Sequence, residues 1–338
     1  MRMLVTLLLT LAAAPAVAQV VLKNERASLT LEGWANGAWS IGDGVQADGA
    51  LRALGLIAVP KLGRIGARVV AEGEAGTTDD TGIGERTVLW TGALGRLEYG
   101  RRQGLPDVLT GYAPNPFTFT TAEFGPASGL ALDPADGIVS RFLPTDRAAR
   151  YDRLALLGYG PAGFADRSRK LLYIAPKRAG WLGGVSYAAA EDLLQTGLVH
   201  ETYSGQNVVR VGGSWSRSET SESERFDSFH VGASIDIDQV WMLGIAATAD
   251  DAESDARGVT AIINWNRGPW TIGGYLQSTA ARSDAAAGRD RLRVVETGLS
   301  YRTSTKLRLF AAWQHYRLVA PAHTTNDDLL ILGARLTI

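Results

Sequence analysis

Val259-Thr-Ala-Ile-Ile-Asn-Trp265 and Trp270-Thr-Ile-Gly-Gly-Tyr-Leu-Gln277 are the two segments that decide the fold. In each of them every second residue is apolar or small, and most of the residues between are polar. This period of two is typical of a β-strand with one apolar and one polar face. Only Asn266-Arg-Gly-Pro269 separates the segments, and Gly-Pro is a common turn sequence. We therefore predict an antiparallel hairpin here.

Similar segments recur along almost the whole chain. We interpret sixteen of them as strands, each about as long as a barrel strand. Their approximate ranges are 29–41, 51–59, 64–72, 83–92, 94–101, 169–175, 181–190, 195–203, 207–217, 226–236, 240–249, 257–265, 270–279, 291–302, 307–318 and 329–338.

The connections between these segments alternate in length. Short turns such as Pro60-Lys61 and Gly92-Ala93 alternate with longer polar loops such as 42–49 and 280–290. Short turns at one rim and long loops at the other are typical of outer-membrane barrels, in which the short turns face the periplasm. Sixteen strands leave an aqueous interior, so the apolar face must point outward. The sequence thus predicts an all-β fold, a transmembrane antiparallel β-barrel of sixteen strands.

The first eighteen residues have the pattern of a secretory signal peptide. Arg2 supplies the positive charge, Leu4 to Leu11 the apolar region, and Ala16-Val-Ala18 a small-residue cleavage site. No later segment reaches the roughly 20 apolar residues of a spanning helix. We expect residues 1–18 to be removed and residues 19–338 to form one barrel domain, exported through the Sec pathway to the outer membrane of a Gram-negative cell.

The composition excludes several kinds of function. The chain has no cysteine, so a disulfide scaffold and thiol chemistry are excluded. Its four histidines, His200, His230, His315 and His323, lack the spacing of metal ligands. A formal net charge of -1 argues against nucleic acid as a partner. We therefore expect no cofactor, no metal and no nucleic acid, and we expect that the protein is not an enzyme.

One stretch, residues 102–167, breaks the strand rhythm. A loop of this length in a compact domain usually has a function of its own. We expect it to be the third long loop of the barrel, folded into the lumen. Within it, residues 145–159 fit a helix capped by Thr145. Alternatively, residues 150–159 form a further strand, which would raise the strand count toward eighteen.

Several segments resemble one known family, the trimeric general-diffusion porins of Gram-negative outer membranes, particularly the alphaproteobacterial type. Leu94-Gly-Arg-Leu-Glu-Tyr-Gly-Arg101 resembles the strand that enters the constriction loop, and Lys170 to Tyr187 resembles the strand, turn and strand that follow it. Arg52-Ala-Leu-Gly-Leu56 resembles the second strand, and Ala122-Glu-Phe-Gly125 is similar to the acidic motif of the loop. The resemblance covers the mature chain.

The resemblance implies a constriction in which an acidic row on the loop faces a basic row on the wall. Such opposed rows orient dipolar solutes and filter them by size and charge. The acidic candidates on the loop are Asp107, Glu123, Asp133 and Asp136. The basic candidates on the wall are Arg52, Arg64, Arg68, Arg96, Arg101 and Arg169.

Two basic candidates are conditional. Arg101 faces the pore only if Gly100 interrupts the alternation of the strand, as glycine can at a bulge. Arg169 or, alternatively, Lys170 would substitute for an arginine that family members carry where this chain has Leu172. The other interpretation of any of these arginines is a solvated strand residue, or a contact with lipopolysaccharide at the rim. A further departure is the last residue, Ile338, where members end in Phe or Trp, which the barrel-assembly machinery reads.

The predicted function is passive diffusion of small hydrophilic solutes and ions through a water-filled outer-membrane porin. The expected partners are two further copies in a homotrimer, outer-membrane lipid and lipopolysaccharide, the barrel-assembly machinery, and the permeating solutes and ions. One alternative is a substrate-selective channel of sixteen or eighteen strands. A remote alternative is a hydrolase built on a barrel, which would need a Ser–His pair that the four histidines do not evidently supply.

Overall fold

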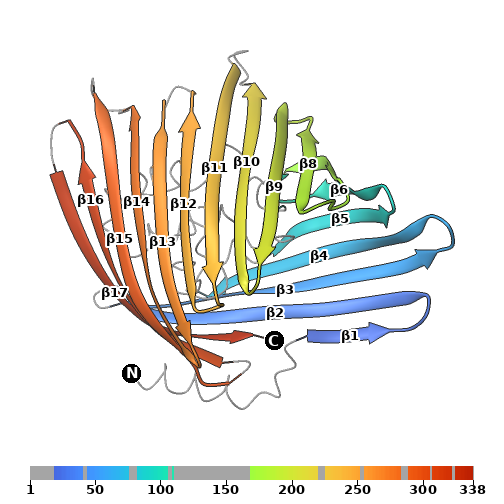
Figure 1. Cartoon of the computed structure of the whole chain (residues 1–338), viewed down its shortest axis with the longest axis horizontal. Coiled ribbons are helices and arrows are strands. Elements are labelled where there is room, and N and C mark those ends of the chain that lie inside the picture. The colour runs from blue at the N-terminus through green and yellow to red at the C-terminus, as the bar shows by residue number, and fades with distance from the viewer. Residues whose placement is uncertain are drawn as a thin grey trace.

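The computed structural model describes residues 19–337, except for 41–43, 76–81, 106–108, 110–167, 220–224, 252–254, 283–287, 305–306 and 322–323. In this part the chain forms seventeen strands and a single sheet (Figure 1). The strands are β1 (Gln19–Lys23), β2 (Ala27–Ser40), β3 (Gly44–Val59), β4 (Gly63–Ala75), β5 (Gly82–Gly92), β6 (Gly95–Arg101), β7 (Arg169–Ile174), β8 (Trp181–Ala188), β9 (Leu193–Ser204), β10 (Asn207–Glu219), β11 (Arg225–Ile237), β12 (Trp241–Asp250), β13 (Arg257–Arg267), β14 (Trp270–Arg282), β15 (Arg289–Arg302), β16 (Leu307–Val319) and β17 (Thr324–Thr337).

The sheet closes on itself. From β2 to β17 each strand pairs antiparallel with the next, and β17 pairs back with β2. These sixteen strands form the ring, which confirms the predicted all-β barrel. Closure leaves no unpaired sheet edge in the ring, and in lipid it satisfies the backbone hydrogen bonds that water cannot.

The short strand β1 was not predicted. It pairs with the first half of β2, whereas β17 pairs with the second half. Thr337 lies opposite Trp34 and Gln19 lies opposite Glu32, so β17 and β1 follow one another along the same edge of β2. Figure 1 shows the C-terminal end of the chain beside the start of β1. Together the two ends of the chain therefore complete one position of the ring.

Two predicted boundaries are wrong. Residues 42–49 were expected to be a loop, but β3 begins at Gly44, opposite Ser40. β17 begins at Thr324 instead of 329. Both segments carry Gly, Asp or Asn, which are poor strand formers, and in both of them pairing with a long neighbouring strand overrides local propensity.

Side chains alternate between the two faces of the wall as predicted. On β14, Leu276 is 50% exposed on the outer face, whereas Tyr275 and Gln277 on the inner face are 4% and 1% exposed. At the short-turn ends, the outer face carries aromatic pairs. The ring centroids of Trp241 and Trp265 are 6.5 Å apart. Trp270 and Tyr301 lie 4.5 Å apart.

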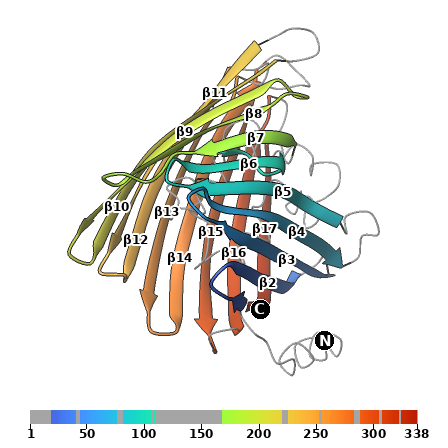
Figure 2. The same cartoon turned by 90° about the vertical axis from the view of Figure 1, so that its right-hand side faces the viewer.

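Aromatic residues at this level form the belt that marks a membrane–water interface. Figure 2 shows the same wall from the side, with the hairpins β9–β10, β11–β12 and β13–β14 ending together at one rim.

Three expectations lie outside the described residues. These are the signal peptide at residues 1–18, most of the long loop, and the choice between helix and strand at 145–159. No helix in the described part of the chain is long and apolar enough to cross a membrane.

Candidate functional site

The inner face of β4, β5 and β6 carries a chain of ion pairs. At its centre is Arg102, the first residue after β6. Its Nη1 lies 2.7 Å from both carboxylate oxygens of Glu85, and its Nε lies 3.2 Å from Glu98 Oε2. Arg68 extends the chain on one side, with Nε 3.1 Å from Glu85 Oε2. Arg96 extends it on the other side, with Nε 2.6 Å from Glu98 Oε1. We call these five residues the loop-anchoring network.

This network holds the base of the long segment against the wall. Glu85, Glu98 and Arg102 are all less than 5% exposed. The backbone N–H of Arg102 also donates to the carbonyl oxygen of Ser168, 3.2 Å away, so the two ends of the segment are tied together. The arginines stabilise these carboxylates, because a buried charge without a partner costs several kcal/mol. The chain therefore leaves β6 in a fixed place.

Two leucines continue this course along the inner wall. Leu105 and Leu109 are fully buried, and they pack with the inner residues Leu172, Ile174, Leu182 and Val199 of β7, β8 and β9. The backbone N–H of Leu105 donates to Gln195 Oε1 on β9 at 3.0 Å. The described start of the long segment thus lies inside the barrel.

A pair of glycines receives these leucines. Gly184 on β8 lies directly opposite Gly197 on β9. A Cβ at Gly184 would lie 2.9 Å from Leu105 Cδ1, and a Cβ at Gly197 would lie 2.7 Å from Leu109 Cδ1. Real Cβ atoms do not approach other atoms so closely, so the absence of side chains at both positions creates the space for the leucines. We call this the glycine socket.

A second set of ion pairs lies near the short-turn rim. Glu201 on β9 accepts from Lys177 Nζ at 2.6 Å and from Arg210 Nε at 3.0 Å. Arg210 on β10 also pairs with Asp236 on β11. We call these four residues the mouth network. It joins neighbouring strands and the β7–β8 turn, but none of its members belongs to the long segment.

The inner face of β14, β15 and β16 mixes apolar side chains such as Leu292, Val294 and Leu318 with a row of amides and hydroxyls. Gln314 Nε2 donates to Glu296 at 2.6 Å, and Tyr316 donates to Gln314 Oε1 at 3.0 Å. Tyr275 donates to Gln277 Oε1 at 2.6 Å. The inner face of β3 to β6 carries Arg52, Arg64, Arg68 and Arg96, and further inner cations stand at Lys170 on β7 and Arg210 on β10.

The predicted basic residues divide between the two faces. Arg68 and Arg96 belong to the loop-anchoring network, and Arg52 and Arg64 fall on the same inner face of β3 and β4. Arg101 and Arg169 do not. They lie opposite one another on β6 and β7 and are exposed on the outer face, beside Tyr99 and Leu171.

The expectation that Arg101 and Arg169 line the pore is therefore corrected. Gly100 has φ of 143°, yet the alternation continues through it, with Glu98 and Arg102 inside and Tyr99 and Arg101 outside. Arg169 shares the outer face of its strand with Leu171. The four acidic candidates, Asp107, Glu123, Asp133 and Asp136, lie outside the described residues.

Sequence reasoning missed both carboxylates of the network and the glycine socket. Glu85 is two residues from Thr87 on β5, and Glu98 is two residues from Arg96 on β6, so each lies on the polar face of its strand. This alternation could have identified both carboxylates as residues of the inner wall. Arg102 was counted as part of the loop. The Gly184–Gly197 pair has no signal in one sequence, because only the register of β8 on β9 brings the two residues together.

Comparison with known proteins agrees with this geometry. The family model of Gram-negative porins matches residues 5–335. The chain belongs to the Gram-negative porins. No curated protein matches the sequence. The match covers nearly the whole chain, and members of this family are outer-membrane channel proteins.

Solved structures of outer-membrane proteins share the fold at low sequence identity. OmpF of Salmonella typhi in complex with daunomycin is 13% identical, with a TM-score of 0.66 over 94% of this chain and 100% of that one. A loop L8 deletion mutant of OmpT, an outer membrane protein of Vibrio cholerae, is 11% identical, with 0.64 over 93% and 100%. An anion-selective porin from Comamonas acidovorans is 15% identical, with 0.56 over 92% and 100%.

Proposed function

We propose that this porin lets small hydrophilic solutes and ions diffuse passively through a water-filled lumen, which the segment 102–167 narrows. The observation that carries the proposal is the course of that segment at its start. Arg102, Leu105 and Leu109 all lie against the inner wall, held by the loop-anchoring network and the glycine socket. A segment that leaves its strand inward places its charges in the path of solutes.

Charged side chains on the inner wall would act on the ions and dipolar solutes that pass. Arg68, Arg96 and Arg102 pair with Glu85 and Glu98, and Arg52 and Arg64 stand on the same inner face of β3 and β4. We expect Asp107, Glu123, Asp133 and Asp136 to supply the opposing acidic row. Fixed charges of opposite sign across a narrow lumen select ions and orient dipolar solutes.

Planar-bilayer conductance of the purified protein tests this function. We expect stepwise insertion of open pores and, in a salt gradient, a reversal potential that moves toward cation selectivity in Arg68→Ser. Glu123→Lys is expected to move it toward anions. If the protein formed no pores, the channel function would be refuted. If ion selectivity were unchanged in both variants, the proposal of opposed acidic and basic rows would be wrong.

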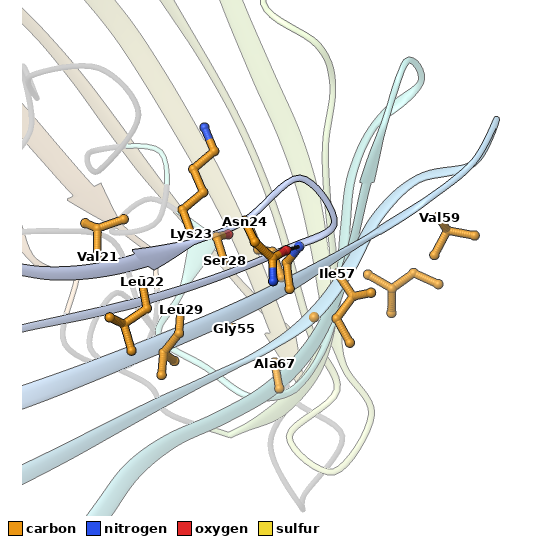
Figure 3. Close-up of a pocket in the computed structure, with 14 residues that line it drawn as sticks. Val21, Leu22, Lys23, Asn24, Ser28, Leu29, Gly55, Ile57, Val59 and Ala67 are labelled. Atoms are coloured by element: carbon orange, nitrogen blue, oxygen red, sulfur yellow. Dashed lines mark hydrogen bonds between the residues drawn. The ribbon is translucent and has the colours of Figure 1, made fainter.

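We also propose that the functional unit is a homotrimer. A hollow of about 1100 Å³ lies on β1 to β4, lined mostly by apolar residues, among them the exposed Leu22 and Ile57. Figure 3 shows Leu22, Leu29 and Ala67 on one side of these strands and Val21 and Lys23 on the other. Gly55 lines this hollow, and a Cβ atom added to Gly55 would have no other atom within 4 Å. Such a hollow can accept side chains of a second copy.

The mass of the protein in detergent, measured by light scattering, tests this assembly. Gly55→Phe fills the hollow and is expected to yield monomers. Gly274→Phe is the matched control, because it places the same side chain on the outer face of β14, and it should stay trimeric. Trimers that survive Gly55→Phe would place the interface elsewhere.

Processing and insertion complete the proposal. We expect Sec export, cleavage after Ala18, and insertion by the barrel-assembly machinery. The mass of the protein extracted from outer membranes tests the cleavage, since the mature chain should begin at Gln19.

A further inference from the structure

Four arginines stand together on the outer face of β13, β15 and β16. We call them the outer arginine patch: Arg257, Arg291, Arg293 and Arg317. Each arginine is an even number of residues from an exposed apolar residue of its own strand, such as Val259, Val295 or Trp313, and therefore points outward as that residue does. Arg257, Arg291 and Arg293 lie near the starts of β13 and β15, and Arg317 lies near the end of β16, so all four are at the long-loop ends of their strands.

The register brings these arginines close to one another. Arg293 lies directly opposite Arg317. Arg257 and Arg291 lie on either side of Ala280, the residue opposite both of them on β14. Ser278, the neighbour of Arg293 on β14, is also small. The arginines thus surround a shallow area floored by small side chains.

Like charges in directly opposed positions of a sheet are destabilising. Within the described part of the chain, Arg291, Arg293 and Arg317 form no ion pair that would offset this cost. Arg257 comes within 3.9 Å of Asp255, but that carboxylate is bound by Arg289. On the neighbouring strand β17, Asn326 lies opposite Arg317, and Asp328 on the same face pairs with His315 at 3.0 Å. The patch therefore retains a concentrated positive charge.

The height of the patch in the membrane identifies its surroundings. Arg291 and Tyr301 stand on the same face of β15, ten residues apart. That distance is about 33 Å along a strand and about 25 Å along the membrane normal for a strand tilted by about 40°. An outward apolar band is also about 25 Å tall. With Tyr301 at the lower aromatic belt, Arg291 and Arg257, which is level with it across Ala280, lie at the headgroups of the outer leaflet. Arg293 and Arg317 lie two residues lower, about 5 Å below that level, and their long side chains can extend up to the headgroups.

We propose that the outer arginine patch binds the phosphate groups of a phosphorylated glycolipid in the outer leaflet, that is, lipopolysaccharide. Arginine binds phosphate through paired N–H donors, which suits it to this ligand better than lysine. Directly below the patch, Val295 and Leu276 offer an apolar surface to acyl chains. An amphipathic ligand fits both features, whereas free inorganic phosphate would use only the charge.

The proposal rests on the orientation of the porin in the outer membrane, but not on what the pore conducts. The test is native mass spectrometry of the mature protein in detergent, with bisphosphorylated lipid A or its dephosphorylated form added. We expect adducts with the phosphorylated lipid only. Removing two arginines that each bind phosphate should weaken binding on the order of tenfold or more, so Arg293→Ser/Arg317→Ser should lose most of the adducts.

Arg267→Ser is the matched control, since Arg267 is exposed on β13 at the opposite, short-turn end. It should bind the lipid as the wild type does. Equal binding of both lipid forms by the wild type would overturn the proposal without any variant. So would full binding by the double variant, competition by millimolar inorganic phosphate, or conversion of the double variant to monomers. Conductance of the double variant should equal that of the wild type, which separates this site from the channel.

Discussion

The loop-anchoring network and the mouth network are built from the same chemistry but have different consequences. In each, a buried carboxylate, Glu85 or Glu201, sits between two cations. The mouth network joins only neighbouring strands and one turn, so it reinforces a wall that backbone hydrogen bonds already hold. The loop-anchoring network includes Arg102, which no longer belongs to a strand. Both networks are paired in the same way, so the difference lies in which segment of the chain the paired residue belongs to. Only an ion pair that holds the long segment can change the width of the lumen.

The largest effect is expected from Glu85→Gln. It leaves Arg68 and Arg102 without their shared carboxylate, and removing one partner of a buried ion pair costs about 3–5 kcal/mol. The start of the long segment should then lose its fixed position. We expect a lower free energy of unfolding in urea and a larger, noisier single-channel conductance.

Glu201→Gln is the control that isolates the position of the network. It should also lower stability, although less, because Lys177 is 41% exposed and can be solvated. Its conductance should remain that of the wild type. If the two variants changed conductance equally, the contrast between the networks would be wrong.

The second-largest effect is expected from changes in the packing of the glycine socket, which involve no charged group. Gly197→Ala places a methyl group 2.7 Å from Leu109 Cδ1, while the next atom is 3.5 Å away. Overpacking of this kind costs about 1–3 kcal/mol. Leu109→Ala removes the contact and leaves a cavity instead.

In the double variant the new methyl group partly fills that cavity. We therefore expect the loss of unfolding free energy in Gly197→Ala/Leu109→Ala to be smaller than the sum of the single losses. Strictly additive losses would show that Leu109 does not occupy the socket. Arg68→Ser serves as the comparison, since it disturbs charge and leaves the socket intact.

The third effect concerns a single hydrogen bond. Gln195 Oε1 accepts from the backbone N–H of Leu105 and from Ser186 Oγ, each at 3.0 Å. Gln195→Leu leaves that buried N–H without a partner, at a cost of about 1–3 kcal/mol. We expect faster amide hydrogen exchange at Leu105, measured by mass spectrometry, with the exchange of β12 and β13 unchanged. Unchanged exchange at Leu105 would mean that the segment is held by other contacts.

Much of this molecule could be predicted from its sequence, because a barrel strand needs only the alternation of faces. The hairpin at 259–277 shows this, since its two faces, its turn and its place in the ring follow from residue order. Segments that depend on pairing partners could not be predicted: β1 and the start of β3 are strands only because β2 lies beside them.

The candidate site was predicted only in part, and for the same reason. Parity placed Arg52, Arg64, Arg68 and Arg96 on the inner face, but it could not show which carboxylates they meet. Arg101 depended on a bulge at Gly100, and the strand keeps its alternation there. Contacts across strands require the register, which one sequence does not contain.

The smallest effect is expected from an ion pair of the same chemistry on the outer face. Arg217 binds Asp227 through Nε at 2.9 Å and Nη2 at 2.8 Å, and its guanidinium lies 5.1 Å from the centre of the Trp215 ring. The geometry is as good as that of Arg102 with Glu85. However, the Arg217 side chain is 47% exposed near the loop rim, where water and headgroups can replace the carboxylate. Arg217→Ser should leave conductance, selectivity and the urea midpoint close to those of the wild type. A destabilisation equal to that of Glu85→Gln would show that pairing itself, and not burial beside the long segment, gives the inner network its importance.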